Sequence, residues 1–135
     1  MTNSTLANEA HPDAVVEIHR TYIEAGADAI GTNTFVASEL HLEMAGKDPA
    51  SAGQLATRAA QLARRAVEES GRDVYVGGSI GPSPGAIESD AGDTTFGIAD
   101  ANARDAPARN VDALVEGGAD FLARQSTRLN SSHLV

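Results

Sequence analysis

The 135-residue chain contains no cysteine and no tryptophan, and aromatic residues make up only 4% of it. Without cysteine, the chain cannot form a disulfide, a thiolate nucleophile or a thiolate metal site. Because rings are so scarce, the core has to be built from Ala, Val, Ile and Leu, and 41% of the residues are hydrophobic. The length allows one domain and is too short for two ordinary ones.

Positive charge and long apolar runs are also scarce. The formal net charge is -9, and Lys47 is the only lysine among ten basic residues. Binding to a phosphate backbone needs clustered Lys and Arg, so we expect neither nucleic acid nor an anionic membrane as a partner. The first residues do not resemble a signal peptide, and no segment approaches the roughly 18 apolar residues of a spanning helix. The expected location is therefore the cytoplasm.

The first part of the chain predicts a helix followed by a buried strand. Residues 11–25 have helical periodicity, with Pro12 in the expected first turn and Gly26 where a left-handed cap ends many helices. We expect the inward face of this helix to consist of Val15, Ile18, Tyr22 and Ala25, flanked by Val16 and Ile23. Residues 27–35 are mostly small or apolar and lack proline, which is typical of a strand covered on both faces.

The same order of elements occurs twice more. Residues 51–70 predict the clearest helix of the chain, and residues 73–80 predict the strand that follows it. A third helix is predicted near residues 108–116, and a third strand over residues 119–123. Helix followed by strand, three times with short connections, indicates an α/β fold with a parallel sheet and helices on its outside.

Two segments follow predicted strands, where parallel α/β folds bind their ligands. Residues 32–35 cluster hydroxyls and a carboxamide that can hydrogen-bond a polar ligand, and an ordinary strand cap is the alternative. Residues 77–85 contain glycines that allow close backbone approach and prolines that stiffen the loop. This run matches neither a Walker loop nor a dinucleotide fingerprint. From these residues alone, one candidate function is a non-catalytic module that binds phosphate or a small anion at Gly77–Gly85.

The histidines and the long acidic loop predict no catalytic or metal site. The four histidines are scattered and are expected at the surface: His11, His19, His41 and His133. They form neither the i, i+4 pair of a helical zinc site nor a recognisable Ser-His-Asp arrangement. Residues 83–106 contain four aspartates whose spacing misses the calcium-loop pattern, so we expect a solvated loop there.

Several segments, in this order and at this spacing, resemble the homocysteine S-methyltransferase family, whose module also opens cobalamin-dependent methionine synthases. The matching segments are residues 18–28, 32–35, 78–82 and 116–122. The resemblance covers residues 8–122. It implies that residues 1–123 are part of a (β/α)8 barrel of the TIM type, which has eight parallel strands each followed by a helix.

The resemblance also implies a reaction, the transfer of a methyl group to the sulfur of homocysteine to form methionine. The residues that it places in the homocysteine pocket are Thr32, Asn33, Gly78, Ser79 and Gly81. The family activates the thiol on a zinc ion held by three cysteines in later strands. Because this chain has no cysteine, we expect it to have no metal ligand or catalytic residue of its own and to be inactive by itself. The methyl donor and the oligomeric state stay open.

Both ends of the chain depart from the family pattern. The family's acidic, glycine-rich first strand is missing before Asn8, and with it an aspartate expected to help hold the amino acid. Residues 123–127 stand where the family's fourth strand ends in an acidic residue and a threonine. Residues 124–135 form a polar tail outside the family pattern. Residues 126–135 are typical of translated sequencing-adapter read-through, and a genuine polar tail is the alternative.

Overall fold

A computed structural model describes residues 3–81 and 110–124 of the chain. Along the chain, a helix over residues 110–117 follows the second strand and precedes the third. The other elements, in chain order, are η1 (Ser4–Leu6), α1 (Ala7–Ala10), α2 (Pro12–Glu24), β1 (Ala29–Gly31), α3 (Glu39–Met44), η2 (Pro49–Ser51), α4 (Ala52–Ser70), β2 (Tyr75–Ile80) and β3 (Phe121–Arg124). The predicted alternation of helix and strand is confirmed.

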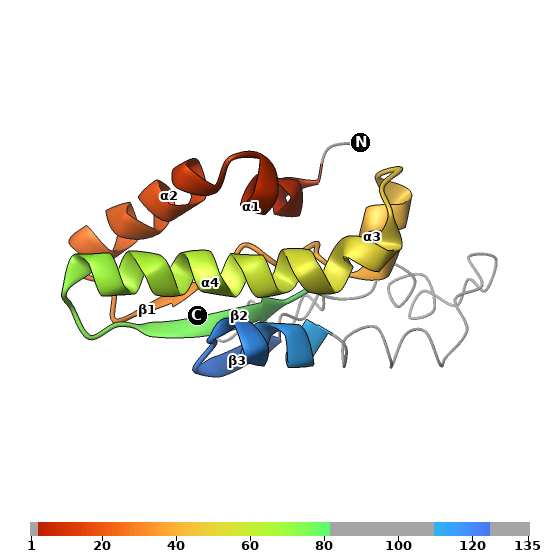
Figure 1. The fold of residues 1–135 in the computed structure, drawn as a ribbon. Helices are drawn as coiled ribbons and strands as arrows, with labels where there is room; N and C mark the ends of the chain where they lie inside the picture. Colours follow the sequence, from red (N-terminus) through yellow and green to blue (C-terminus); the bar gives the residue numbers. More distant parts are fainter. Residues whose placement is uncertain (1–2, 82–109, 125–135) are drawn as a thin grey trace, which may run out of the picture.

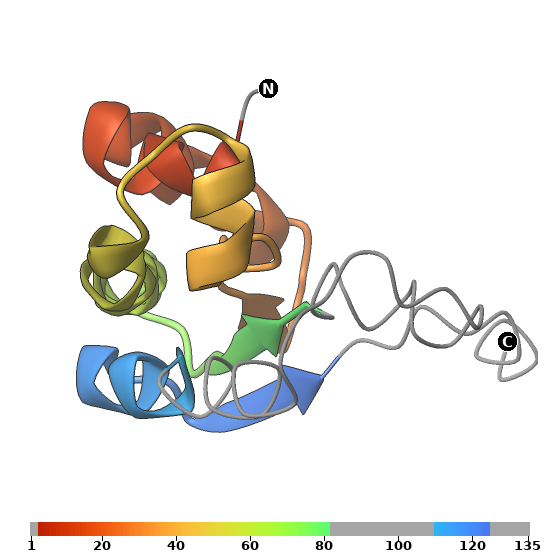
Figure 2. The same cartoon turned by 90° about the vertical axis from the view of Figure 1, so that its right-hand side faces the viewer.

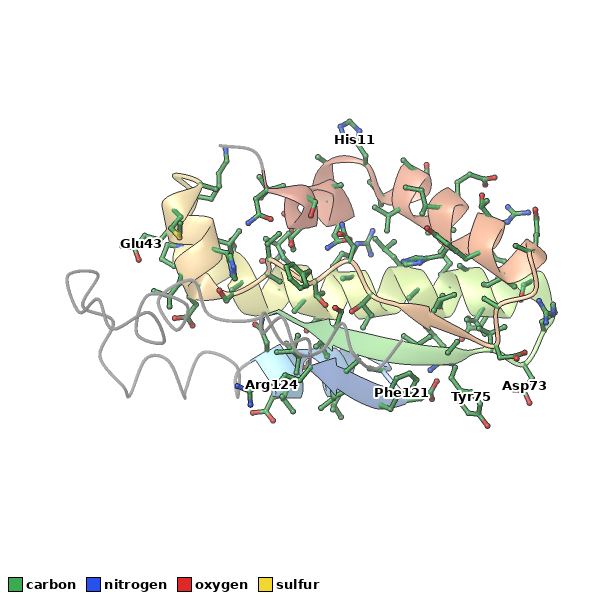
Figure 3. All side chains as sticks on the ribbon, turned by 180° about the vertical axis from the view of Figure 1, so that it is seen from behind. His11, Glu43, Asp73, Tyr75, Phe121 and Arg124 are labelled. Atoms are coloured by element: carbon green, nitrogen blue, oxygen red, sulfur yellow. The ribbon has the colours of Figure 1, made fainter. Side chains whose placement is uncertain are left out.

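The three strands form one parallel sheet in the order β1-β2-β3. Figure 1 shows α4 running alongside the sheet, and Figure 2 shows α2, α4 and the helix over residues 110–117 on one side of the strands. In the part of the chain that the structure describes, the other face of the sheet is uncovered. Tyr75 and Phe121 project from that face, with 65% and 46% of their surface exposed (Figure 3). A parallel sheet is normally covered on both faces, and the described residues cover only one face of this sheet.

The centre of the fold is α4, whose sequence is rich in alanine and also contains charged residues. Its inward face consists of alanines together with Leu55, Leu62 and Val67, all buried. Small side chains let the helix lie close to the sheet, where Leu62 packs in the same cluster as Ile30 and Val76. Leu55 packs in a separate cluster with Leu42 and Ala52. The helix ends at Gly71, whose φ of 70° is the left-handed conformation that glycine adopts most readily. The end predicted for this helix is confirmed.

The inward face predicted for α2 is wrong in part. Val15 is buried as expected, but Ile18 and Tyr22 are 58% and 62% exposed. The buried residues of α2 are Val15, Val16, His19 and Ile23. Apolar side chains surround more than half of this helix, so their spacing alone does not decide which of them face inward. The helix packs mainly against α4 rather than over β1, and this contact turns the face containing His19 toward the core.

Several boundaries also differ from those predicted. β1 is limited to Ala29–Gly31, because residues 32–38 leave the sheet to form the loop that leads to α3. The sequence gives no prediction of α3, which begins after Ser38. The Ser38 side chain accepts a hydrogen bond from the His41 amide. Arg124, assigned to the tail, lies in β3. The loop over residues 83–106 lies outside the described residues.

Among the described helices, none combines the length and the apolar character needed to cross a bilayer.

Candidate functional site

The carboxyl ends of β1 and β2 bring together two of the segments singled out in the sequence. Residues 32–35 follow β1 directly, and Ser79 lies near the end of β2. The two strands are parallel and adjacent, so their ends lie at the same edge of the sheet. This is the edge at which parallel α/β folds place ligands. The structure therefore places Thr32 close to Ser79, as the strand order predicts.

Two threonine hydroxyls fix the backbone of Ser79 from both sides. Thr34 Oγ1 donates to the Ser79 carbonyl oxygen at 2.5 Å, and the Ser79 amide donates to Thr32 Oγ1 at 3.0 Å. The two hydroxyls lie 2.7 Å apart. Since the single proton of Thr34 is used by Ser79, Thr32 must be the donor in this third bond. Both hydroxyl protons are thus committed within the protein, and both threonines are buried.

The backbone of Ser79 is therefore fixed, while its hydroxyl makes no hydrogen bond to the described residues. Val76 and Ile80 face the helices, so the alternation of the strand turns Tyr75 and Ser79 toward the uncovered face. The hydroxyl of Ser79 has no hydrogen-bond partner within residues 3–81 and 110–124, and the residue is half-buried. A half-buried hydroxyl on a fixed backbone is well suited to bind a polar ligand. The sequence did not single out Thr34 as a residue that fixes the Ser79 backbone, although Thr34 belongs to the polar segment 32–35.

Asn33 is held by the N-terminal segment rather than left free for a ligand. Its Nδ2 donates to the Ser4 carbonyl oxygen at 2.8 Å and to Asn8 Oδ1 at 3.4 Å, and Asn8 Nδ2 donates to the Asn33 carbonyl oxygen at 3.0 Å. Asn3 makes a similar bond to the Val36 carbonyl oxygen at 2.8 Å. These bonds attach η1 and α1 to the loop after β1. Asn33 retains its Oδ1 atom as an acceptor without a partner in the described part of the chain.

Two of the glycines that were predicted to line the pocket are required by contacts within the chain. A Cβ atom on Gly81 would lie 2.0 Å from the Phe35 carbonyl oxygen, so only glycine allows the two loops to approach so closely. A Cβ atom on Gly78 would lie 2.9 Å from Leu122 and 3.0 Å from Leu114. Close packing therefore accounts for glycine at both positions, and residues 82–85 of the predicted anion loop lie outside the described part of the structure.

The expectation that the histidines are surface residues is wrong for His19. His19 is only 6% exposed, and burial lowers its pKa below the ordinary value of 6.5. Its Nε2 atom has no hydrogen-bond partner among the described residues. His41 is half-buried, its pKa is also lowered by burial, and its Nδ1 atom lies 2.6 Å from Ser38 Oγ. His11 is exposed as expected, and His133 lies outside the described residues.

The residues of this chain do not form a metal site in the part that the structure describes. No group of three His, Cys, Asp or Glu side chains comes together there. The sequence has no cysteine at all. The three thiolates that the family resemblance implies for zinc therefore have no counterpart in this chain.

Comparison with known proteins identifies one family. The family model described as homocysteine S-methyltransferase matches residues 1–127. Methionine synthase of Mycobacterium tuberculosis (strain ATCC 25618 / H37Rv) is 37% identical over 122 residues, which cover 87% of this chain and 10% of that protein. Methionine synthase of Mycobacterium leprae (strain TN) is 35% identical over 120 residues, or 85% of this chain and 9% of that protein.

Solved structures give the same result. The homocysteine methyltransferase MmuM from Escherichia coli, in its metallated form, superimposes with a TM-score of 0.70 at 28% identity, over 90% of this chain and 45% of that chain. The oxidized form of the same protein gives a TM-score of 0.68 over 88% of this chain and 43% of that chain. The chain thus spans about a tenth of the length of the methionine synthases and less than half of MmuM.

Proposed function

Because the chain belongs to the homocysteine S-methyltransferase family, we propose that it forms one side of the homocysteine pocket of an enzyme that makes methionine. The observation that supports this is the hydroxyl of Ser79, which has no partner among the described residues, on a backbone held by Thr32 and Thr34. In this proposal Ser79 binds the polar end of the amino acid, together with the backbone of Gly78 and Gly81. Positions held before the ligand arrives lose little entropy on binding.

Thr32 and Asn33 contribute to the same pocket in different ways. Thr32 has its hydroxyl proton committed to Thr34 and therefore acts mainly by positioning Ser79. Asn33 keeps the acceptor Oδ1, which suits the ammonium group of an amino acid. The bonds from Asn33 to Ser4 and Asn8 fix the loop that carries this acceptor.

We further propose that the uncovered face of the sheet is part of the interior of an eight-stranded barrel. The parallel strand order, the helices on one side and the exposed Tyr75 and Phe121 support this. In such barrels the interior is filled by side chains from all strands, and the ligand lies at the carboxyl ends. Ser79, near the end of β2, then lies beside the substrate.

A metal ion does not fit the residues present here. The MmuM structure is named as a metallated form, and a zinc-bound thiolate is a good nucleophile at neutral pH. This chain has no cysteine, and its described residues include no group of three metal ligands. We therefore derive no step of the reaction through a metal on this chain, and we propose that the chain by itself does not transfer methyl groups. Methionine formation by the purified chain with zinc, homocysteine and methyl donors would contradict this.

The pocket is tested by transplanting this chain into a complete enzyme. We would replace the matching segment of the Mycobacterium tuberculosis methionine synthase with this chain and measure methionine formation from homocysteine. The chimera should be active, and Ser79→Ala should raise the KM for homocysteine about tenfold, as loss of one hydrogen bond predicts. Arg58→Ala, which changes an exposed side chain on α4, is the matched control. A well-folded chimera in which Ser79→Ala leaves KM unchanged would refute the role of Ser79.

A further inference from the structure

Asn8 is a fully buried residue of α1 whose side chain bonds to one residue of the proposed pocket through both of its polar atoms. The residue is 0% exposed. Its Nδ2 donates to the Asn33 carbonyl oxygen at 3.0 Å, and its Oδ1 accepts from Asn33 Nδ2 at 3.4 Å. The helix that carries it packs against α2 and α4 (Figure 1). A buried amide destabilises a fold unless its groups are paired, and in the described part of the chain both pairings go to Asn33.

Two backbone carbonyl groups decide how the amides of Asn8 and Asn33 are oriented. A carbonyl oxygen only accepts hydrogen bonds, so the amide atom that faces it must be the nitrogen. The Ser4 carbonyl oxygen, 2.8 Å from Asn33 Nδ2, therefore holds this nitrogen on the side of the N-terminal segment. The Asn33 carbonyl oxygen holds Asn8 Nδ2 in the same way, which leaves Asn8 Oδ1 to face Asn33 Nδ2. If the Asn33 amide were turned over, its oxygen would meet two acceptors and no donor.

The orientation of this amide matters because its two ends attract opposite charges. The nitrogen donates to a carboxylate, whereas the oxygen accepts from an ammonium group. With Nδ2 held by Ser4 and Asn8, the amide atom of Asn33 without a partner among the described residues is Oδ1. An amino acid carries both charged groups. The orientation of one amide thus determines which of them binds beside β1 and which is left for the hydroxyl of Ser79 on β2.

We propose that Asn8 is a positioning residue that keeps the Asn33 amide oxygen available to the substrate and thereby makes the pocket select thiols that carry an ammonium group. Asn8 does not touch the substrate and acts only through Asn33. The inference rests on the proposed homocysteine pocket and adds the direction in which the amino acid lies, with its ammonium group at the end of β1 and its carboxylate at the end of β2. Asn3 supports the same loop by donating to the Val36 carbonyl oxygen at 2.8 Å.

The test uses the methionine synthase chimera and compares two thiols. One is homocysteine, and the other is 4-mercaptobutanoate, which lacks only the ammonium group and is measured as a competitive inhibitor. Asn8→Leu places a side chain of similar volume without polar atoms at this position. It should raise the KM for homocysteine about tenfold, the equivalent of one hydrogen bond, and leave the inhibition constant of 4-mercaptobutanoate unchanged. An equal change for both thiols, or no change for either, would overturn the proposal.

Further variants test whether Asn8 acts through Asn33. Asn33→Leu removes the acceptor itself, so the double variant Asn8→Leu/Asn33→Leu should have the same KM for homocysteine as Asn33→Leu alone. Asn8→Asp keeps an acceptor for Asn33 Nδ2 and should retain the selectivity for homocysteine. Additive effects of the two leucine substitutions, or loss of selectivity in Asn8→Asp, would contradict the proposal. Glu9→Gln changes the exposed neighbour of Asn8 on α1 and, as the matched control, should change neither constant.

The melting temperature of each chimera shows whether the variant folds, and Asn8→Ala is made as well because a smaller side chain cannot clash. If neither Asn8→Leu nor Asn8→Ala folds, the proposal is wrong, because Asn8 then stabilises the fold rather than orienting one amide. A folded chimera that makes no methionine, or in which Ser79→Ala leaves KM unchanged, refutes the proposed pocket and this inference with it. The inference alone fails when Ser79→Ala acts as expected and the Asn8 variants do not distinguish the two thiols.

Discussion

Replacement of Asp120 should reveal how β2 and β3 are joined at their amino-terminal ends. The carboxylate atom Oδ2 accepts a hydrogen bond from the Val76 amide at 2.8 Å and another from Arg64 Nη2 at 2.7 Å. Arg64 also donates to the Gly118 carbonyl oxygen at 2.6 Å. One carboxylate oxygen therefore connects the middle strand, the turn before β3 and α4.

The two bonds differ in what their loss should cost. Val76 is fully buried, so Asp120→Ala leaves its amide without a partner, at a cost of about 1–3 kcal/mol. The ion pair with Arg64 is partly exposed, with 29% and 38% of the two side chains accessible, and such pairs contribute about 0–1 kcal/mol. We therefore expect Asp120→Ala to lower the free energy of unfolding by about 2 kcal/mol. Asp120→Asn keeps an acceptor for Val76 and should cost about 1 kcal/mol or less.

The effect should also depend on pH in a defined direction. The hydrogen bond from the Val76 backbone and then the bond from Arg64 hold the pKa of Asp120 below its ordinary value of 3.8. A lowered pKa means that this stabilisation is complete above pH 3.8 and is lost as the pH falls through the lower pKa of the folded state. The difference between wild type and Asp120→Ala should therefore shrink in acid.

Urea denaturation followed by circular dichroism measures the free energy of unfolding. Repeating it from neutral pH to pH 3 gives the pH dependence of that free energy. Two results would refute the reasoning. The first is an Asp120→Ala variant within about 0.5 kcal/mol of the wild type at neutral pH, which is the range of ordinary surface substitutions. The second is an Asp120→Asn variant that is less stable than Asp120→Ala, because the retained acceptor would then have no value.

Three further substitutions, two of them with a control variant, test the core and the strand ends by the same denaturation assay. Leu62→Ala should cost about 2–5 kcal/mol because Leu62 is 2% exposed in the core, whereas exposed Gln61→Ala should stay within about 0.5 kcal/mol. Thr34→Val removes the donor to Ser79 and should cost about 1–3 kcal/mol, and Thr34→Ser should recover most of it because the hydroxyl returns. Gly81→Ala should destabilise the chain by more than about 1 kcal/mol, since its Cβ would overlap the Phe35 carbonyl oxygen. Equal stability of Thr34→Val and wild type, or a neutral Gly81→Ala, would contradict the described contacts.

Local signals in the sequence predicted the order of the elements and where several of them end. Gly26 was expected to end one helix, and another helix was expected to end at residue 70; Gly26 and Gly71 both adopt positive φ, at 104° and 70°. The helix expected over residues 51–70 is α4, in which alanines and other apolar residues form the buried side and the charged residues lie elsewhere. The strands were placed correctly, but β1 was predicted too long, because a run of small and polar residues does not show where the sheet pairing stops.

Long-range hydrogen bonding decided the details of the candidate site. The segment around Thr32 was recognised as polar and as lying at a strand end, and this much follows from its position after β1. That Thr34, rather than Thr32, donates to Ser79 depends on a contact between residues 45 positions apart. The attachment of Asn33 to Ser4 and Asn8 likewise joins segments that the sequence does not place together.

The sequence alone determined the helix and strand order, the ends of two helices and the family resemblance that the comparisons confirm. These depend on neighbouring residues, whose periodicity and backbone preferences act over a few positions. Only the tertiary structure decided that His19 is buried while Ile18 and Tyr22 are exposed. A helix with apolar residues around most of its circumference can turn any of several faces inward, and its packing against α4 selects one of them.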